Sequence, residues 1–354
     1  MTSSAFVVLA CFSVAMCAAS WSYPVGKGAV VEVVVDDRHV YAPLETYLSR
    51  AGVLYALNRS TGALLWQVVP GDYLWAILSR NDGVIFLGYG NQGLQCLDAA
   101  TGKVLWDVPS LTLPGEAVSM IMHRGVLVVA VGFAGVVGLD PGSGQALWGT
   151  PLALREGFSG DSQGHLYVGL QHGVAALDVS NGAVVWTYTN PGGSNDYTST
   201  NPQFSKQYVM ASNNEGFFAL NASTGAQLWS GAPNASFAFF FSAVHNDVLL
   251  ACGNGGLFGL SIYTGAILWT QPDFNFFTTT VDRGVVYAPF GSQLVGLDAN
   301  SGVTVFKQAM SWPLCSDCIW GLQVMNATAY YSQTFNPSSF SYSINAVSLQ
   351  GFKK

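Results

Sequence analysis

The hydrophobic positions of the chain form short apolar runs that are separated by turn residues. The segment "LDAATGKVLW" ends one apolar run at Leu97, turns at Gly102 and starts a second run that ends at Trp106. The Asp98 carboxylate can accept the backbone N–H groups just ahead of it, and Gly102 can adopt the positive φ that ends the loop. The segment therefore predicts a β-hairpin.

The same hairpin occurs seven times along the chain. Asp or Asn opens the turn in six copies and Ser261 opens it in the other, while Gly closes the turn in all seven. The copies end, 37 to 43 residues apart, at Trp66, Trp106, Trp148, Trp186, Trp229, Trp269 and Phe306. A repeat of this length made of short strands is typical of a β-propeller blade and not of a helical solenoid.

Two more strand-like runs precede each hairpin, which gives four strands per repeat. Apolar runs such as residues 126–131 lack strict alternation, as expected for strands that are covered on both faces. A four-stranded sheet packed between two similar sheets is a propeller blade. We therefore expect the terminal aromatic residues to be structural and buried, each filling the wedge between adjacent blades.

The two ends of the chain supply one further blade. After Phe306 the sequence has three strand-like runs but no hairpin ending in Trp, and Trp21 lies 45 residues before Trp66. We expect residues 20–25 to pair beside residues 344–349, which would remove two exposed sheet edges. The sequence thus predicts an all-β, eight-bladed β-propeller of four-stranded antiparallel blades, with the N-terminal strand closing the last blade. Seven blades is the alternative.

The start of the chain indicates a secretory protein. Residues 1–19 contain no charged side chain and an apolar run that ends in small residues, the pattern of a signal peptide. Residues 20–354 are then a single propeller domain. No later segment has 18 apolar residues without a break, so we expect no transmembrane segment in the mature chain. The predicted location is outside the cell or in the secretory lumen, or the periplasm in a bacterial host, and we expect a monomer.

Composition excludes some partners and suggests modifications. With 50% hydrophobic and 9% charged residues and a net charge of −7, the chain has no basic surface for nucleic acid. Four Asn residues lie in Asn-X-Ser/Thr sequons and are glycosylation candidates in a eukaryotic host, although several such sequons arise by chance in a chain rich in Asn, Ser and Thr. They are Asn58, Asn221, Asn234 and Asn326.

The cysteines have two expected roles. Cys315 and Cys318 lie in "CSDC" before the last blade, and a local disulfide is the expected state in an oxidising compartment. Cys96 and Cys252 lie in apolar strands and are expected to be small buried side chains. A zinc site would need a second pair with ligand spacing, which the sequence does not supply.

The repeat as a whole resembles the tryptophan-docking motif of the quinoprotein β-propellers, the PQQ-like repeat family. Asp or Asn, then Thr/Ser-Gly, then three residues and Trp covers essentially the whole mature chain. Trp21 takes the same docking role for the closing strand. The resemblance implies one of two groups. Quinoprotein dehydrogenases hold pyrroloquinoline quinone (PQQ) with calcium or a lanthanide, and non-catalytic propellers include the scaffold lipoprotein of the bacterial outer-membrane β-barrel assembly machine.

The residues favour the non-catalytic group. The cofactor chemistry needs a cation with oxygen ligands and an acidic base, but the acids are assigned to turns or scattered singly, and the histidines are interpreted as solvated turn residues. We expect no catalytic, cofactor or metal residues. The predicted function is a protein- or glycan-binding scaffold that acts through four irregular loops, with a divergent PQQ-dependent oxidoreductase as the alternative. The loops are residues 43–52, 190–202, 272–277 and 334–340.

Overall fold

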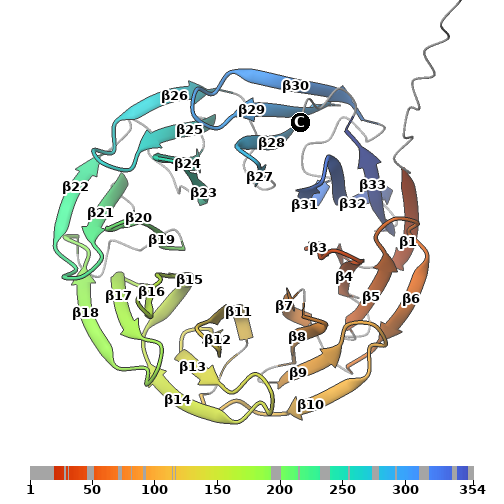
Figure 1. Cartoon of the computed structure of the whole chain (residues 1–354), viewed down its shortest axis with the longest axis horizontal. Coiled ribbons are helices and arrows are strands. Elements are labelled where there is room, and N and C mark those ends of the chain that lie inside the picture. Colours follow the sequence, from red (N-terminus) through yellow and green to blue (C-terminus); the bar gives the residue numbers. More distant parts are fainter. Residues whose placement is uncertain are drawn as a thin grey trace, which may run out of the picture.

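The computed structural model describes residues 20–349, apart from residues 28, 31, 46–51, 71–73, 81, 91–92, 114, 116, 193–200, 214–215, 232–239, 254–255, 273–278, 292, 311–318 and 337–340. The strands of this part of the chain form eight antiparallel sheets arranged as a ring (Figure 1). Seven sheets contain four strands, and the first contains five because the short strands β2 and β3 both pair with β4. The predicted eight-bladed all-β propeller is confirmed.

The strands follow one another around the ring as successive blades. Blade 1 comprises β2 (Ala29–Val30), β3 (Val34–Val35), β4 (His39–Glu45), β5 (Gly52–Asn58) and β6 (Leu64–Val68); blade 2 comprises β7 (Leu74–Arg80), β8 (Val84–Tyr89), β9 (Gly93–Asp98) and β10 (Val104–Val108); blade 3 comprises β11 (Ala117–His123), β12 (Val126–Val131), β13 (Gly135–Leu139) and β14 (Ala146–Pro151); blade 4 comprises β15 (Leu154–Gly160), β16 (His165–Leu170), β17 (Gly173–Asp178) and β18 (Val184–Thr189).

The second half of the ring repeats the arrangement. Blade 5 comprises β19 (Gln203–Ser205), β20 (Tyr208–Asn213), β21 (Gly216–Asn221) and β22 (Gln227–Gly231); blade 6 comprises β23 (Phe240–His245), β24 (Val248–Gly253), β25 (Gly256–Ser261) and β26 (Ile267–Gln271); blade 7 comprises β27 (Thr280–Asp282), β28 (Val285–Phe290), β29 (Gln293–Asp298) and β30 (Thr304–Ala309); blade 8 comprises β31 (Ile319–Met325), β32 (Thr328–Asn336), β33 (Ser341–Ser348) and β1 (Trp21–Lys27).

Blade 8 is assembled from both ends of the chain. Strand β1 pairs antiparallel with β33, with Trp21 opposite Ala346 and Lys27 opposite Ser341. The red and blue ends of the chain therefore lie side by side in Figure 1. Pairing of the N-terminal strand with the last strand is confirmed, and it extends two residues beyond the predicted N-terminal segment.

The hairpin turns have the expected chemistry. In blade 2 the Asp98 carboxylate accepts the N–H of Thr101 at 2.8 Å, and the Gly102 N–H donates to the Asp98 carbonyl oxygen at 2.8 Å. Gly102 has a φ of 70°, which an L side chain adopts only with strain. The turn is therefore fixed locally, by residues within one copy of the repeat.

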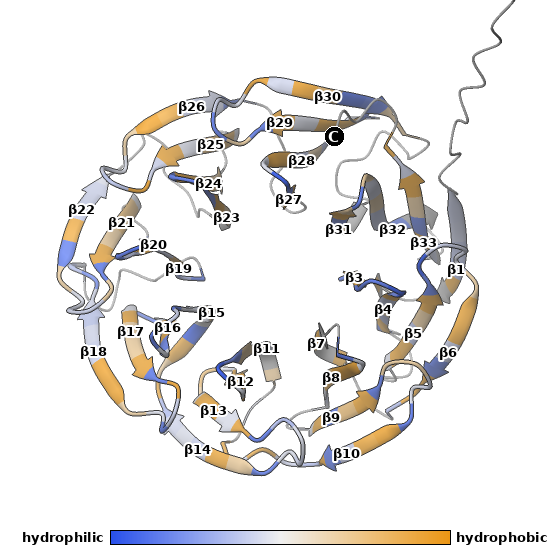
Figure 2. Cartoon of the chain, viewed as in Figure 1, coloured by the Kyte–Doolittle hydropathy of each residue, from blue (hydrophilic) through white to orange (hydrophobic). Residues whose placement is uncertain are grey.

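Burial within a blade changes from the middle strands to the outer strand. In blade 3 the side chains of β13 are buried throughout, because the neighbouring blades cover both faces of the sheet. The outer strands instead expose aliphatic side chains just before their docking aromatic residue, such as Leu105 and Leu268, which are 52% and 53% exposed. Figure 2 shows these apolar residues along the rim of the disc, on strands such as β10 and β26.

The turns of the ring alternate between two faces, because each blade is an antiparallel meander. Turns between first and second strands and between third and fourth strands lie on one face, as residues 124–125 and 140–145 do in blade 3. We call this the hairpin face. Turns between second and third strands, and connections between blades, lie on the opposite face, as residues 132–134 and 152–153 do. We call this the loop face.

The four irregular loops of the sequence all start and end on the loop face. Two of them join second and third strands, and two join one blade to the next. The central residues of each loop lie outside the part of the chain that the structure describes. Within that part, no helix has the length and apolar character needed to cross a membrane.

Candidate functional site

Each tryptophan of the repeat lies on the hairpin turn of the following blade. Its indole N–H donates to a backbone carbonyl of that turn at 2.8 to 3.2 Å, and its ring lies against the glycine that closes the turn. The pairs of indole and carbonyl are Trp21 with Arg59, Trp66 with Ala99, Trp106 with Pro141, Trp148 with Val179, Trp186 with Ala222, Trp229 with Ile262 and Trp269 with Ala299. Seven blade junctions of the described ring therefore carry the same contact.

The tryptophan rings are less buried than the sequence analysis expected. Trp269 is buried at 9% exposure, but the other six rings are only part-buried, because they lie near the rim of the disc. The indole hydrogen bond therefore accompanies a smaller apolar contact than full burial would give.

The junction between blades 7 and 8 is built differently. Phe306 takes the tryptophan position there, is 8% exposed, and packs edge-on against Tyr287 with ring centroids 6.1 Å apart. It also belongs to a buried cluster with Leu322 and Leu349. Phenylalanine has no N–H to donate, and blade 8 has no hairpin turn between its third and fourth strands, because β1 supplies the fourth strand.

A hydrogen-bond network around Asp161 fixes a turn on the hairpin face of blade 4. One carboxylate oxygen accepts the N–H groups of Gln163, Gly164 and His165 at 2.8 to 2.9 Å. The other accepts the Tyr167 hydroxyl at 2.8 Å and lies 2.9 Å from Nδ1 of His165. Burial raises the pKa of Asp161, but the hydrogen bonds outweigh it and lower the pKa to about 2.

Asp36 forms a corresponding network in blade 1. Its carboxylate accepts the N–H groups of Arg38 and His39 and the hydroxyl of Tyr41, at 2.8, 2.6 and 2.9 Å. Burial raises the pKa of Asp36, but these hydrogen bonds hold it below the ordinary value. Sequence reasoning missed both networks, although the shared pattern of Asp, His and then Tyr two residues later was present in "DDRHVY" and "DSQGHLY".

Replacing Asp161 with Asn is expected to lower the free energy of unfolding by about 2 kcal/mol at pH 7. The pKa of this group is lowered from 3.8 to about 2 on folding, so its stabilisation is present above pH 4 and is lost as the pH falls towards 2. Urea unfolding at pH 7 and at pH 2.5 should show the difference between wild type and variant shrinking. Asp140→Asn is the matched control, because Asn already occupies that turn position at Asn58 and Asn221. An equal loss in both variants would contradict the prediction.

The histidines are not all solvated turn residues, and that interpretation is wrong for three of them. His39 and His165 lie within the two aspartate networks. The His123 ring lies where a side chain on Gly160 would be, 2.7 Å from an added Cβ, and burial lowers its pKa. His123 therefore packs between blades 3 and 4, whereas His39 and His165 are held by side chains of their own blades.

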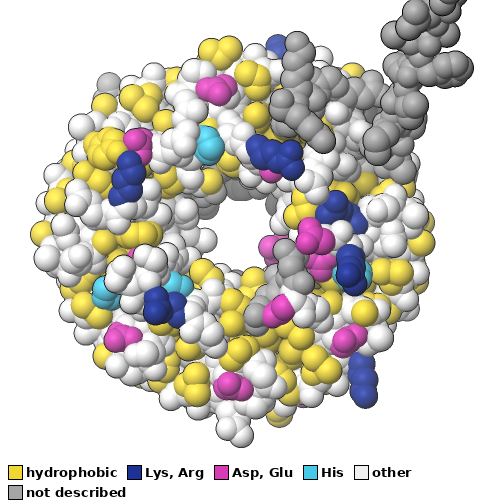
Figure 3. Space-filling view, in the orientation of Figure 1, with side chains coloured by type: hydrophobic (Ala, Val, Ile, Leu, Met, Phe, Trp, Pro, Cys, Tyr) yellow, Lys and Arg dark blue, Asp and Glu magenta, His cyan; other side chains and the backbone are white. Residues whose placement is uncertain are grey.

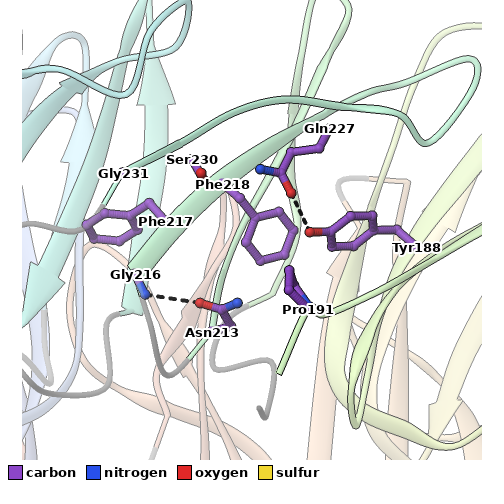
Figure 4. A pocket seen from close by; sticks show the side chains of 9 residues that line it. All are labelled: Tyr188, Pro191, Asn213, Gly216, Phe217, Phe218, Gln227, Ser230 and Gly231. Carbon is purple, nitrogen blue, oxygen red and sulfur yellow. Dashed lines mark hydrogen bonds between the residues drawn. The ribbon is translucent and has the colours of Figure 1, made fainter. Parts of the chain in front are cut away.

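A cavity of about 250 Å³ lies at the junction of blades 4 and 5 (Figure 4). It is lined by Tyr188, Pro191, Asn213, Gly216, Phe217, Phe218, Gln227, Ser230 and Gly231. We call it the junction cavity. It extends from Gln227 to the loop-face ends of β18, β20 and β21, and the sequence analysis did not anticipate it.

The centre of the ring is open, and acidic side chains gather on one side of the opening (Figure 3). Solvent reaches Glu32, which precedes β3, yet the surrounding protein desolvates its carboxyl and raises the pKa to about 6. Among the described residues, no three His, Cys, Asp or Glu side chains come together as a potential metal site.

The structure describes some of the remaining predicted residues. Cys96 and Cys252 are buried thiols outside any disulfide, as expected, whereas Cys315, Cys318 and Asn234 lie outside the described residues. The other three sequons are on the hairpin face. Asn58 and Asn221 hold their turns by accepting backbone N–H groups at 3.0 to 3.1 Å, and Asn326 accepts the Arg283 guanidinium at 2.7 Å.

An eight-bladed ring whose blades are joined by indoles docked on turn glycines defines a tryptophan-docking β-propeller of the PQQ-like repeat class. The chain belongs to the family of the outer membrane protein assembly factor BamB, whose sequence pattern matches residues 10–161 and 132–275. A BamB from Yersinia pestis is 35% identical over 97 residues. That match covers 25% of this chain and only 22% of the relative.

Solved structures share the fold at low sequence identity. BamB from Moraxella catarrhalis superposes with a TM-score of 0.68 at 16% identity, over 92% of this chain and 98% of that one. Quinohemoprotein alcohol dehydrogenase from Comamonas testosteroni gives 0.65 at 13% identity, over 95% of this chain and 77% of that one. The predicted resemblance to the BamB type is confirmed by the family match, whereas the dehydrogenase comparison shows the fold alone.

Proposed function

We propose that this chain is a protein-binding scaffold that acts in the assembly of outer-membrane proteins and catalyses no reaction itself. Membership of the BamB family supports this role. The observation that carries the proposal is the division of the ring into two unlike faces. The irregular loops start and end on the loop face, whereas short repeated turns close the hairpin face.

The hairpin face is poorly suited to recognising a particular partner. Its turn residues form the contacts with the docked tryptophans and the hydrogen bonds within the turns. Nearly the same residues recur from blade to blade. A partner that is recognised once needs a surface that differs around the ring, and variable loops on a rigid scaffold provide such a surface. The loop face also exposes large apolar side chains, among them Phe133 at 77% and Phe290 at 43%.

We further propose that the mature protein is a monomer in the periplasm, or in the secretory route of a host without one. A glycan is the alternative to a protein as the partner of the loops. The oxidoreductase alternative predicts that the protein takes up PQQ and calcium. We expect no stoichiometric mass gain when both are added before native mass spectrometry.

Photo-crosslinking in the native host tests whether the partner binds the loop face. Phe133 and Phe290 on the loop face and Tyr263 on the hairpin face are replaced one at a time by p-benzoylphenylalanine, which preserves an aromatic side chain at three exposed positions. Crosslinks to proteins of outer-membrane assembly are expected from the first two positions and not from Tyr263. Deleting the protein should also lower the amount of integral outer-membrane proteins. Crosslinks from Tyr263 alone, or unchanged membranes after deletion, would refute the proposal.

A further inference from the structure

We propose that the junction cavity binds an uncharged sugar ring. This goes beyond the scaffold role, because it assigns a small-molecule site to one particular junction of the ring. The cavity is half open, and its lining reaches the loop-face ends of β18, β20 and β21, so a bound saccharide would lie beside the face proposed for the protein partner.

The cavity lies at a junction that has an aromatic residue two positions after the docked tryptophan, where the other hairpins that end in tryptophan have Val, Thr, Gly or Gln. At this position the side chain can reach the turn of the next blade, as when the Thr150 hydroxyl donates to the Gly182 carbonyl at 2.6 Å. Gln271 makes the corresponding bond to Gly302 at 2.8 Å. Tyr188 occupies this position in blade 4, and its hydroxyl donates to Oε1 of Gln227 at 2.5 Å.

The blade 5 side of the cavity combines one large and one small side chain. Ser230 lies opposite Phe218 in the register of β21 and β22, so both side chains are on the same face of the sheet. The Phe218 ring lies 5.2 Å from the Tyr188 ring, measured between centroids, and Figure 4 shows Pro191 beside them. The small Ser230 side chain leaves room for a ligand next to the two rings.

The lining is polar but uncharged. None of its nine residues is ionised at neutral pH, and Asn213, Gln227 and Ser230 contribute amide and hydroxyl groups. Asn213 is 6% exposed, and its Oδ1 accepts the Gly216 N–H at 3.0 Å, so this amide is held in place. A charged ligand would lose its hydration without meeting an opposite charge, which is costly.

A hydrocarbon ligand also fits the lining poorly. It would strip water from the exposed Gln227 and Ser230 side chains without replacing their hydrogen bonds, at about 1–3 kcal/mol for each group. A pyranose ring instead offers hydroxyl groups to the amides and a C–H face to Tyr188 and Pro191. The volume of about 250 Å³ lies below the roughly 300–1,000 Å³ of drug-sized sites, which suits one ring.

The test is a titration of the full chain followed by amide signals in ¹H–¹⁵N TROSY spectra. Glucose and N-acetylglucosamine are the neutral probes, glucose 6-phosphate and glucosamine are their respective charged counterparts, and N-acetyl-Pro-Tyr-amide represents a protein partner. We expect saturable shifts at Gly216, Phe218 and Gly231 with at least one neutral sugar. The charged counterpart of that sugar should bind more weakly.

Matched variants show whether the shifts report on the junction cavity. Gln227→Ala is expected to weaken sugar binding about tenfold by removing one amide and the partner of Tyr188. Thr304→Ala changes the corresponding first position of β30 and should bind like wild type. If Gln227→Ala fails to fold, Ser230→Leu fills the cavity and should abolish the shifts, while Thr270→Leu at the same position of β26 should not.

Several results would overturn the proposal. These are the absence of saturation with every neutral sugar, saturation with the peptide alone, or equal weakening in the paired variants. Because the crosslinking positions lie outside the cavity, a failed sugar titration with crosslinks retained would reject the sugar site and leave the scaffold role standing. Sugar binding without crosslinks would support the sugar site and reject the scaffold role.

Discussion

A chain that begins at residue 28 is expected to lose at least about 5 kcal/mol of folding free energy relative to a chain that begins at residue 20. The truncation removes β1, the fourth strand of blade 8. Val25 is 5% exposed within a core cluster that also contains Ile344, and Trp21 docks on the turn of blade 1. Losses of this size are comparable to the whole stability of many domains.

Guanidinium unfolding of the two chains measures this loss. Adding the peptide Trp21–Lys27 in trans should restore part of the stability of the truncated chain, because the peptide can pair with β33. The same peptide carrying Trp21→Ala should restore less, since it lacks the indole bond to Arg59. Equal unfolding midpoints for the long and truncated chains would show that β1 does not close the ring in solution.

Replacing Gly182 with Ala is expected to cost about 3–4 kcal/mol, which combines αL strain with overpacking. Gly182 has a φ of 72°, and an added Cβ would lie 2.4 Å from the Trp148 ring. The ring cannot move away without breaking its bond to the Val179 carbonyl. The substitution therefore disrupts the dock between blades 3 and 4.

Gly125→Ala separates the two causes. Gly125 also has a positive φ, of 85°, but an added Cβ would meet nothing within 4 Å. Its cost is expected to be only the backbone strain, about 1–2 kcal/mol. Thermal or urea unfolding of both variants gives the comparison, and the two costs being equal would mean that the Trp148 contact adds nothing.

The sequence predicted the fold well because each turn of the repeat is determined by residues that are close in sequence. Asp98 and Gly102 determine their turn within five residues. The same turn sequence recurs often enough for the blades to be counted. Closure was also predictable, since the missing strand at one end matched the extra strand at the other. These features depend on residues close in sequence or on simple arithmetic of the repeat.

The junction cavity could not be predicted in the same way. It depends on the large Tyr188 in blade 4 meeting the small Ser230 beside Phe218 in blade 5, and no local pattern records that combination. The network around Asp161 is an intermediate case. Its residues lie within seven positions, but only the pairing of β15 with β16 shows that they meet.

Because blade 8 contains strands from both ends of the described chain, it also determines the order in which the blades can fold. A chain made from its N-terminus presents Trp21–Lys27 before the strands of blades 1 to 7 and Ser341–Ser348 after them, yet these two strands are neighbours in one sheet. Domains generally begin to fold as the chain emerges. During synthesis or export, blades 1 to 7 can therefore stack progressively as an open arc, and the ring gains its final junctions in a single late step.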